Sequence, residues 1–215
     1  MGHGRGSREA ALSDTPPSFA EVVRRRRMTR AFVDTAIAAD VVDAMVDRAR
    51  RAPSAGNTGG TEFLVLEGAA ATAAYWDTTL PAGSRATFPW PSLLAAPVLI
   101  VPWVDPDAYA ARYAEDDKAH TGLGADPADW PVPYWFVDGG AVVMALLLEA
   151  EARDLGALFF GLFDHEDAVR ARFGVPAGRR AVGTVAIGHR APDRPSASAT
   201  RPRPPLDEVI HRTHW

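Results

Sequence analysis

Arginines gather in one short stretch of this sequence, Arg24 to Phe32, which reads RRRRMTRAF. Four consecutive arginines end at Arg27, and Arg30 follows a Met-Thr pair. A guanidinium group is planar and permanently charged, and it can make two parallel hydrogen bonds to one phosphate. Because the chain as a whole is acidic, the cluster favours one small anionic group over a long polyanion. The alternative interpretation is a solvated, charged helix face.

The arginines follow a short amphipathic segment in which Phe19, Val22 and Val23 can share one helical face. Ser18 fits an N-cap with Glu21 three residues on, so we predict a first helix over residues 19–28. The arginines would then lie in its last turn. Positive charge there favours the negative end of the helix dipole, and the chain leaving the helix could bend around a ligand.

A second polar stretch, Ala52-Pro53-Ser54-Ala55-Gly56-Asn57, comes shortly before a strand-like run that begins at Phe63. The two stretches, in this order, resemble the FMN-dependent nitroreductase family. Its members open with a helix ending in R-R-S-x-R-x-F, and a second helix ends in A-P-S-x-x-N before the first strand. Residues 26–32 and 52–57 stand for these two signatures. The resemblance continues at matching distances nearly to the C-terminus.

The resemblance implies roles for the residues of the first signature. Arg26, Arg27 and Arg30 match positions that contact the phosphate and ribityl chain of FMN, with Arg30 able to reach the pyrimidine edge of the flavin. A cation there would stabilise negative charge on the reduced ring. Met28 stands where the family usually has serine, so one side-chain hydrogen bond is expected to be lost.

The second signature implies a loop that touches the flavin, typically from the other subunit, through Pro53, Ser54 and Asn57. After Asn57 the family often has Gln-Pro-Trp, but this chain has Gly59-Gly60-Thr61. This departure removes bulk near the pocket, so the family's usual substrates do not carry over directly.

Two later stretches complete the expected cofactor contacts. Phe160 and Gly161 match a segment whose backbone N–H groups approach the isoalloxazine near its N5 atom; for the phenylalanine side chains, a plain buried strand is the alternative. Arg201 and Arg203 match a late basic pair that closes on the phosphate. For Arg201, a solvated tail remains the alternative interpretation.

Composition excludes several other classes of site. The chain has 215 residues, a formal charge of −4 and no cysteine, so disulfides, thiol nucleophiles and thiolate metal sites are absent. The mild negative charge gives no basic face for nucleic acid. No apolar run reaches the roughly 18 residues that would span a bilayer. Histidines are scattered, so we predict no metal site, and we expect a cytoplasmic protein.

The order of the expected helices and strands predicts an α+β fold, because they do not alternate regularly along the chain as in a doubly wound sheet. The resemblance implies the same: a mostly antiparallel sheet flanked by helices, in an interwoven homodimer. We expect disorder over residues 1–17, an FMN-binding domain over 18–190 and a C-terminal arm over 191–215. The arm is rich in proline and carries apolar residues up to Trp215, which packing on a partner subunit would cover.

A long segment, 115–135, is expected to form a lid over the site. It is rich in Gly, Asp and Pro, and long loops in compact domains are usually functional lids or disordered. The sequence favours the lid because aromatic residues are scarce in disordered segments. Its candidates for stacking on a planar acceptor are Trp130, Tyr134 and Trp135.

No catalytic acid, base or nucleophile stands out, and this suits a flavin, which supplies its own reactivity. The resemblance implies an oxidoreductase that passes hydride from NADH or NADPH through FMN to a small acceptor, such as a nitroaromatic or a quinone. Two alternatives stay open. One is a specialised flavin oxidase or dehydrogenase of a single metabolite, and the other is a flavin-binding protein without turnover.

Overall fold

The computed structural model describes residues 16–215, and the predicted disorder of residues 1–15 lies outside this range. Pro16 and Pro17 form neither helix nor strand. The strands are β1 (Thr61–Glu67), β2 (Val98–Val104), β3 (Gly156–Phe160), β4 (Arg180–Ala181) and β5 (Thr184–Gly188). The helices are α1 (Phe19–Arg25), α2 (Ala39–Ala49), α3 (Gly68–Thr79), α4 (Ala82–Arg85), α5 (Pro106–Tyr113), α6 (Tyr134–Ala152), α7 (Glu166–Phe173) and α8 (Leu206–Val209).

The strands form one sheet in the order β1-β2-β5-β3, with β4 also beside β2. Every pairing is antiparallel, which confirms the α+β class. Residues 180–188 have the sequence pattern of a single strand, but they form two strands, β4 and β5, which Val182 and Gly183 separate. Gly183 has a φ of 143°, which favours glycine, and a side chain there would collide with the Phe159 ring. The strand is interrupted at this residue.

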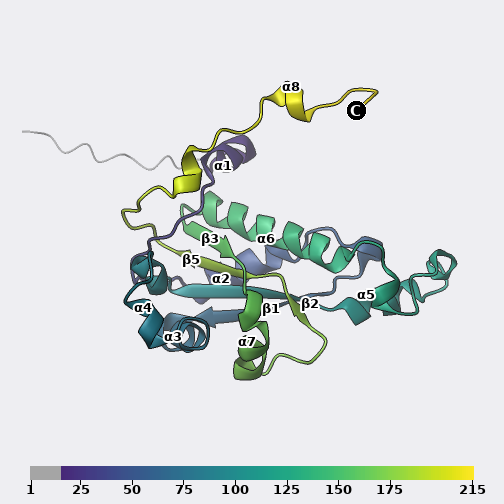
Figure 1. The fold of residues 1–215 in the computed structure, drawn as a ribbon, viewed down its shortest axis with the longest axis horizontal. Coiled ribbons are helices and arrows are strands. Elements are labelled where there is room, and N and C mark those ends of the chain that lie inside the picture. The colour runs from purple at the N-terminus through teal and green to yellow at the C-terminus, as the bar shows by residue number, and fades with distance from the viewer. Residues whose placement is uncertain (1–15) are drawn as a thin grey trace, which may run out of the picture.

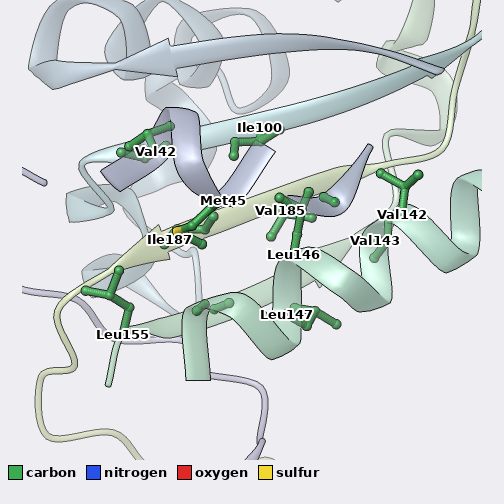
Figure 2. Packing of buried hydrophobic residues seen from close by; sticks show 14 residues of the cluster. Val42, Met45, Ile100, Val142, Val143, Leu146, Leu147, Leu155, Val185 and Ile187 are labelled. Carbon is green, nitrogen blue, oxygen red and sulfur yellow. The ribbon is translucent and has the colours of Figure 1, made fainter. Parts of the chain in front are cut away.

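Two apolar cores lie on the two faces of the sheet, and β2 contributes side chains to both of them. Val98 and Ile100 point into a core that also contains α2 and α6 residues (Figure 2). Leu99, Val101 and Trp103 point into the opposite core, which α3 and α7 cover (Figure 1). Successive side chains of a strand face opposite ways, so covering both faces buries β2 completely.

The second helix has apolar residues at helical spacing, and these residues, Val42, Met45 and Ala49, are buried in the first core. Asp40 has the residue type of an N-cap, but the N-cap is Ala38, and Asp40 lies in the first turn, where its charge still favours the helix dipole. Asp164 is likewise not the cap of α7. It sits in a 3-10 turn, Phe163–His165, and His165 precedes the helix.

The long helix α6 is apolar nearly all round, and residues 16–215 cover only one side of it. Val142, Val143, Leu146 and Leu147 enter the first core (Figure 2). On the opposite side, Val137 and Met144 are 53% and 40% exposed. An apolar helix face left in water is a feature of surfaces that bind other proteins.

The C-terminal arm, residues 191–215, leaves the body of the molecule past α1 (Figure 1). It contains a 3-10 turn, Ala197–Thr200, and the short helix α8. From Ala197 to the end every residue is exposed, including Leu206, Val209 and Trp215. Within residues 16–215, none of the helices has both the length and the apolar character needed to cross a bilayer.

Candidate functional site

The first helix positions the arginine stretch. Ser18 and Glu21 form the predicted capping box, in which Ser18 Oγ accepts from the Glu21 N–H and the Glu21 carboxylate accepts from the Ser18 N–H. The helix ends at Arg25, however, and not at Met28. Arg26 and Arg27 therefore lie beyond the last turn, on extended backbone that begins at Arg26 with φ −52° and ψ 124°.

Ion pairs fix the end of α1 to the end of α6. Arg25 lies 3.2 Å from a carboxylate oxygen of Glu151 and 3.2 Å from one of Asp154. Arg190, from just after β5, pairs with the same two acidic residues, and Glu151 is almost fully buried. Breaking a buried ion pair is costly, so this network holds the start of the arginine stretch in one place.

The stretch then runs beside β3. Met28 forms a parallel bridge to Ala157, and the Thr29 N–H donates to the Ala157 carbonyl at 2.9 Å. Met28 is half-buried and packs against both cores, which accounts for an apolar residue where a serine was expected. The structure thereby brings the arginines next to the strand that ends in Phe160.

Most arginines of this stretch have no acidic partner in the part of the chain that the structure describes. Within residues 16–215, no carboxylate lies within 4.0 Å of the guanidinium groups of Arg24, Arg26, Arg27 or Arg30, and only Arg25 is paired. Arg30 lies over the Trp90 ring, with its guanidinium carbon 5.3 Å from the ring centre. Its backbone N–H donates to the Asp193 carboxylate at 2.7 Å. The side chain stays available to bind an anion.

A pocket of about 400 Å³ opens beside Arg30. It lies between α3, the end of β3 and the chain around Trp90. The rings of Trp76 and Phe160 stack at 5.8 Å with 13° between their planes. A β-carbon at Gly161 would lie 2.5 Å from the Phe163 ring, so the exposed Phe163 side chain covers this glycine. The walls are mostly aromatic and apolar, and Arg30 and His165 supply basic groups.

The Pro53–Asn57 loop lines a different pocket, of about 230 Å³, which shares no residue with the first. Pro53 and Ser54 border it, together with Asp138 from α6. Gly56 and Asn57 both adopt left-handed backbone, with φ of 63° and 55°. In a single chain, therefore, Arg30 of the first signature and Pro53 and Ser54 of the second border two separate pockets, called the first and second half-sites below, and Arg26, Arg27, Met28 and Asn57 line neither.

The late basic pair, Arg201 and Arg203, joins neither half-site in this chain. Both residues are exposed on the C-terminal arm, between the 3-10 turn and α8, and they line none of the pockets described here. Their expected contact with a phosphate stays a prediction.

Comparison with known proteins identifies the fold. The model of the nitroreductase family matches residues 23–189, most of the chain. This chain belongs to the nitroreductase family. The match confirms the resemblance seen in the two signatures, and it supports an oxidoreductase in general terms.

Solved structures agree with this family fold. A nitroreductase family protein from Streptococcus pneumoniae is 21% identical, with a TM-score of 0.70, over 91% of this chain and all of that one. A protein from Exiguobacterium sibiricum, solved in complex with FMN, is 22% identical with a TM-score of 0.68, over 94% and 100% of the chains. A protein named as an NAD(P)H:FMN oxidoreductase, from Staphylococcus epidermidis, is 21% identical with a TM-score of 0.67, over 92% and 97%.

The expected lid of this nitroreductase-family protein is shorter and better packed than the sequence suggested. Tyr134 and Trp135 belong to α6, and the segment before them contains two 3-10 turns, Ala119–Thr121 and Pro127–Asp129. Trp130 and Trp135 are buried in a cluster with Tyr109. Trp130 also donates from Nε1 to the Leu123 carbonyl at 3.0 Å. Of the three aromatic candidates, only Tyr134 is exposed, with 45% of the residue accessible to solvent.

We therefore expect different consequences from substitutions in this segment. Trp130→Phe removes the bond to Leu123 and some buried volume, and should lower the free energy of unfolding by about 1 to 2 kcal/mol. Tyr134→Ala should leave thermal stability nearly unchanged and alter the KM for an aromatic acceptor. Thermal melts and steady-state kinetics on both variants test this expectation. A Tyr134→Ala enzyme with unchanged acceptor kinetics would remove Tyr134 from the site.

Sequence reasoning missed several residues of the first half-site. Trp76 and Trp90 line the pocket, and Asp193 and Arg194 brace it from the C-terminal side. Arg194 lies 4.4 Å from the Trp90 ring centre and donates to the Pro89 carbonyl at 2.6 Å. The Phe-Pro-Trp-Pro run, residues 88–91, was a possible signal, since two prolines around a tryptophan fix the ring's surroundings.

Proposed function

We propose that this chain is an FMN-dependent oxidoreductase that takes hydride from NADH or NADPH and reduces a small acceptor, such as a nitroaromatic or a quinone. The observation that carries the proposal is Arg30, which lines an aromatic pocket and, like its sequence neighbours Arg26 and Arg27, has no carboxylate within 4.0 Å among residues 16–215. Positive charges held close together without counterions favour an anionic ligand. The names of the Exiguobacterium and Staphylococcus proteins support FMN as that ligand.

The residues present fit this cofactor. Arg26 and Arg27 would hold the phosphate, with Arg201 and Arg203 closing on it from the arm. Arg30 would place a permanent cation at the ring, and the backbone at Phe160 and Gly161 would face it. The apolar walls around Trp76 and Phe160 would keep water from the ring. When bound, FMN supplies the two-electron chemistry, which accounts for a site without a catalytic acid or nucleophile.

The acceptor side of the proposed site is more open than the family signature implies. Gly59 has free space around it, so the Gly59-Gly60-Thr61 departure leaves room beside the loop. Gly60 itself is packed against the Tyr109 ring, and a β-carbon there would lie 2.8 Å from it. The departure therefore changes the shape of the acceptor pocket and leaves the arginine stretch unaltered.

We further propose that the protein works as a homodimer. The two half-sites of one chain share no pocket residue, and a second subunit could supply the Pro53–Asn57 loop to the first subunit's arginines. The exposed apolar side of α6 offers one contact surface. The C-terminal arm offers another, since Leu206, Val209 and Trp215 are all exposed in a single chain. A cysteine-free chain suits a reducing compartment, and we propose the cytoplasm.

The direct test is cofactor binding. We expect the purified protein to bind about one FMN per chain, because each chain contributes one arginine set and one loop. Equilibrium dialysis at micromolar FMN measures this, and absence of binding would contradict the proposal. Anaerobic addition of NADH or NADPH should then bleach the flavin absorbance within seconds to minutes. A yellow protein that neither nicotinamide bleaches would instead be a flavin-binding protein without this turnover.

A further inference from the structure

A buried carboxylate, Asp138, lies near the start of α6 and has no role in the proposed function so far. The residue is 8% exposed, and it borders the pocket beside the Pro53–Asn57 loop. Taking a carboxylate out of water is unfavourable unless hydrogen bonds replace its hydration. The bonds that Asp138 makes therefore indicate what this buried charge does.

Both hydrogen bonds of Asp138 reach the same oxygen, Oδ2. It accepts from the backbone N–H of Ala55 at 2.8 Å and from the Tyr109 hydroxyl at 2.7 Å. Tyr109 is fully buried, and burial, together with its bond to Asp138, raises the pKa of its hydroxyl. The phenol thus stays protonated and remains a donor at physiological pH. One oxygen atom thereby joins α6 and α5 to the centre of the loop.

The loop adopts a backbone that needs such support. Gly56 and Asn57 are both left-handed, a backbone that costs free energy for most residues other than glycine and that asparagine tolerates better than most. A β-carbon on Gly56 would lie 2.8 Å from the Tyr113 ring, so the turn is packed closely against α5. A backbone of this kind persists only where surrounding contacts hold it.

Other polar groups of the loop bond to partners other than Asp138. The Arg112 Nε donates to the Gly56 carbonyl at 2.9 Å, and the Thr58 hydroxyl donates to the Ala55 carbonyl at 2.6 Å. The Ala55 N–H, by contrast, points inward to Asp138. Without that carboxylate, the Ala55 N–H and the Tyr109 hydroxyl would both lose their partner in a poorly hydrated place, where unpaired donors are costly.

We propose that Asp138 is a positioning residue that fixes the Pro53–Asn57 loop in the shape that contacts FMN. The inference rests on the proposed function, in which Pro53, Ser54 and Asn57 are cofactor contacts. Asp138 also lies on α6, whose exposed side we propose as a subunit contact. The same helix therefore supports both the loop and the dimer that would bring the loop to the partner's arginines.

The test compares FMN affinity across full-length variants by quenching of FMN fluorescence. Asp138→Ala should bind FMN at least about tenfold more weakly, because the loop loses its inward bond. Asp138→Asn should stay within about threefold of the wild type, since one amide oxygen can take both bonds that Oδ2 accepts. The matched control is Leu146→Ala on the same helix, fully buried in the core away from Asp138's bonds. It should lower the melting temperature without a comparable loss of FMN affinity.

Several outcomes would overturn the inference. Asp138→Ala with wild-type affinity would do so, and so would an affinity loss in Leu146→Ala that matches the Asp138→Ala loss at equal melting temperature. An Asp138→Asn protein as weak as Asp138→Ala would mean that the charge acts, and not the loop bonds.

A second readout separates this inference from the proposed function. Amide hydrogen exchange of residues 53–60 in the FMN-free protein should be faster in Asp138→Ala and nearly unchanged in Asp138→Asn. Unchanged exchange in Asp138→Ala would refute the positioning role whether or not FMN binds. A wild-type protein that fails to bind FMN, with the expected exchange pattern, would refute only the proposed function.

Discussion

Replacing Arg26 and Arg27 together by alanine is expected to weaken FMN binding about a hundred- to ten-thousandfold. Each charge-assisted contact to a phosphate is worth about 1.5 to 3 kcal/mol, and the two contributions add if the residues act independently. Neither guanidinium has an acidic partner among residues 16–215, so their loss should break no ion pair and cost little stability. FMN affinity by fluorescence quenching, together with a thermal melt, measures both effects.

The matched control is Arg24→Ala, in the last turn of α1 and outside the signature. If the stretch is only a solvated charged surface, the Arg26/Arg27 double variant, its two single variants and Arg24→Ala should all be nearly silent. Equal losses for Arg24→Ala and Arg26→Ala would show a diffuse charge effect and contradict a specific phosphate site.

Arg30 should differ from Arg26 and Arg27, because its guanidinium lies beside the aromatic pocket and over Trp90. Arg30→Ala should weaken FMN binding and also lower the reduction potential of the bound cofactor, since a nearby cation favours the more negative form. Arg30→Lys keeps the charge and should preserve much of the potential. A redox titration of each variant decides the point: wild-type affinity and wild-type potential in Arg30→Ala would refute the assignment.

The second large effect is expected at the exposed side of α6. Met144→Asp should dissociate the proposed dimer, because burying an unpaired carboxylate in an apolar contact costs about 3 to 5 kcal/mol, or roughly a hundred- to a few thousandfold in affinity. FMN binding should fall with it, since the half-sites would then separate. Sedimentation velocity reports the mass, and the Val33→Asp variant, with a similar 41% exposure but not on α6, is the control.

The C-terminal arm offers an independent test of the dimer. A chain cut after Ser196 loses the exposed residues 197–215 but keeps Asp193 and Arg194, which brace Arg30 and Trp90. The shortened protein should therefore fold, yet dimerise and bind FMN more weakly. A stable monomer with full FMN affinity, from either this chain or Met144→Asp, would contradict the dimeric site.

Much of the framework could be predicted from the sequence because it depends on local patterns. Ser18 and Glu21 are three residues apart, and a capping box needs nothing more distant. The apolar run of β2 and the helical spacing of Val42, Met45 and Ala49 likewise indicate their own burial. The arginine stretch could be predicted as an anion site from residue type alone, because several guanidinium groups close together in the sequence favour an anionic ligand.

Boundaries were less accurate, because they depend on contacts made by other elements. Alpha-helical spacing continues through Met28, yet α1 ends at Arg25, where the following chain pairs with β3 at Ala157. The apolar run over residues 180–188 is divided by Gly183, whose backbone accommodates the Phe159 ring. Neither partner is near in the sequence, so local propensity had no means of indicating these breaks.

The tertiary structure alone decided which side chains are buried and which distant residues contact one another. Trp130 and Trp135 look like stacking residues in the sequence, but packing against Tyr109 buries them and leaves Tyr134 at the surface. Asp138 reads as one acidic residue at the start of an apolar helix, and only the fold places it against the Ala55 N–H, 83 residues away in the chain. Local spacing determines which face of a helix or strand is apolar, whereas packing and hydrogen bonds between residues distant in sequence determine which partners that face contacts.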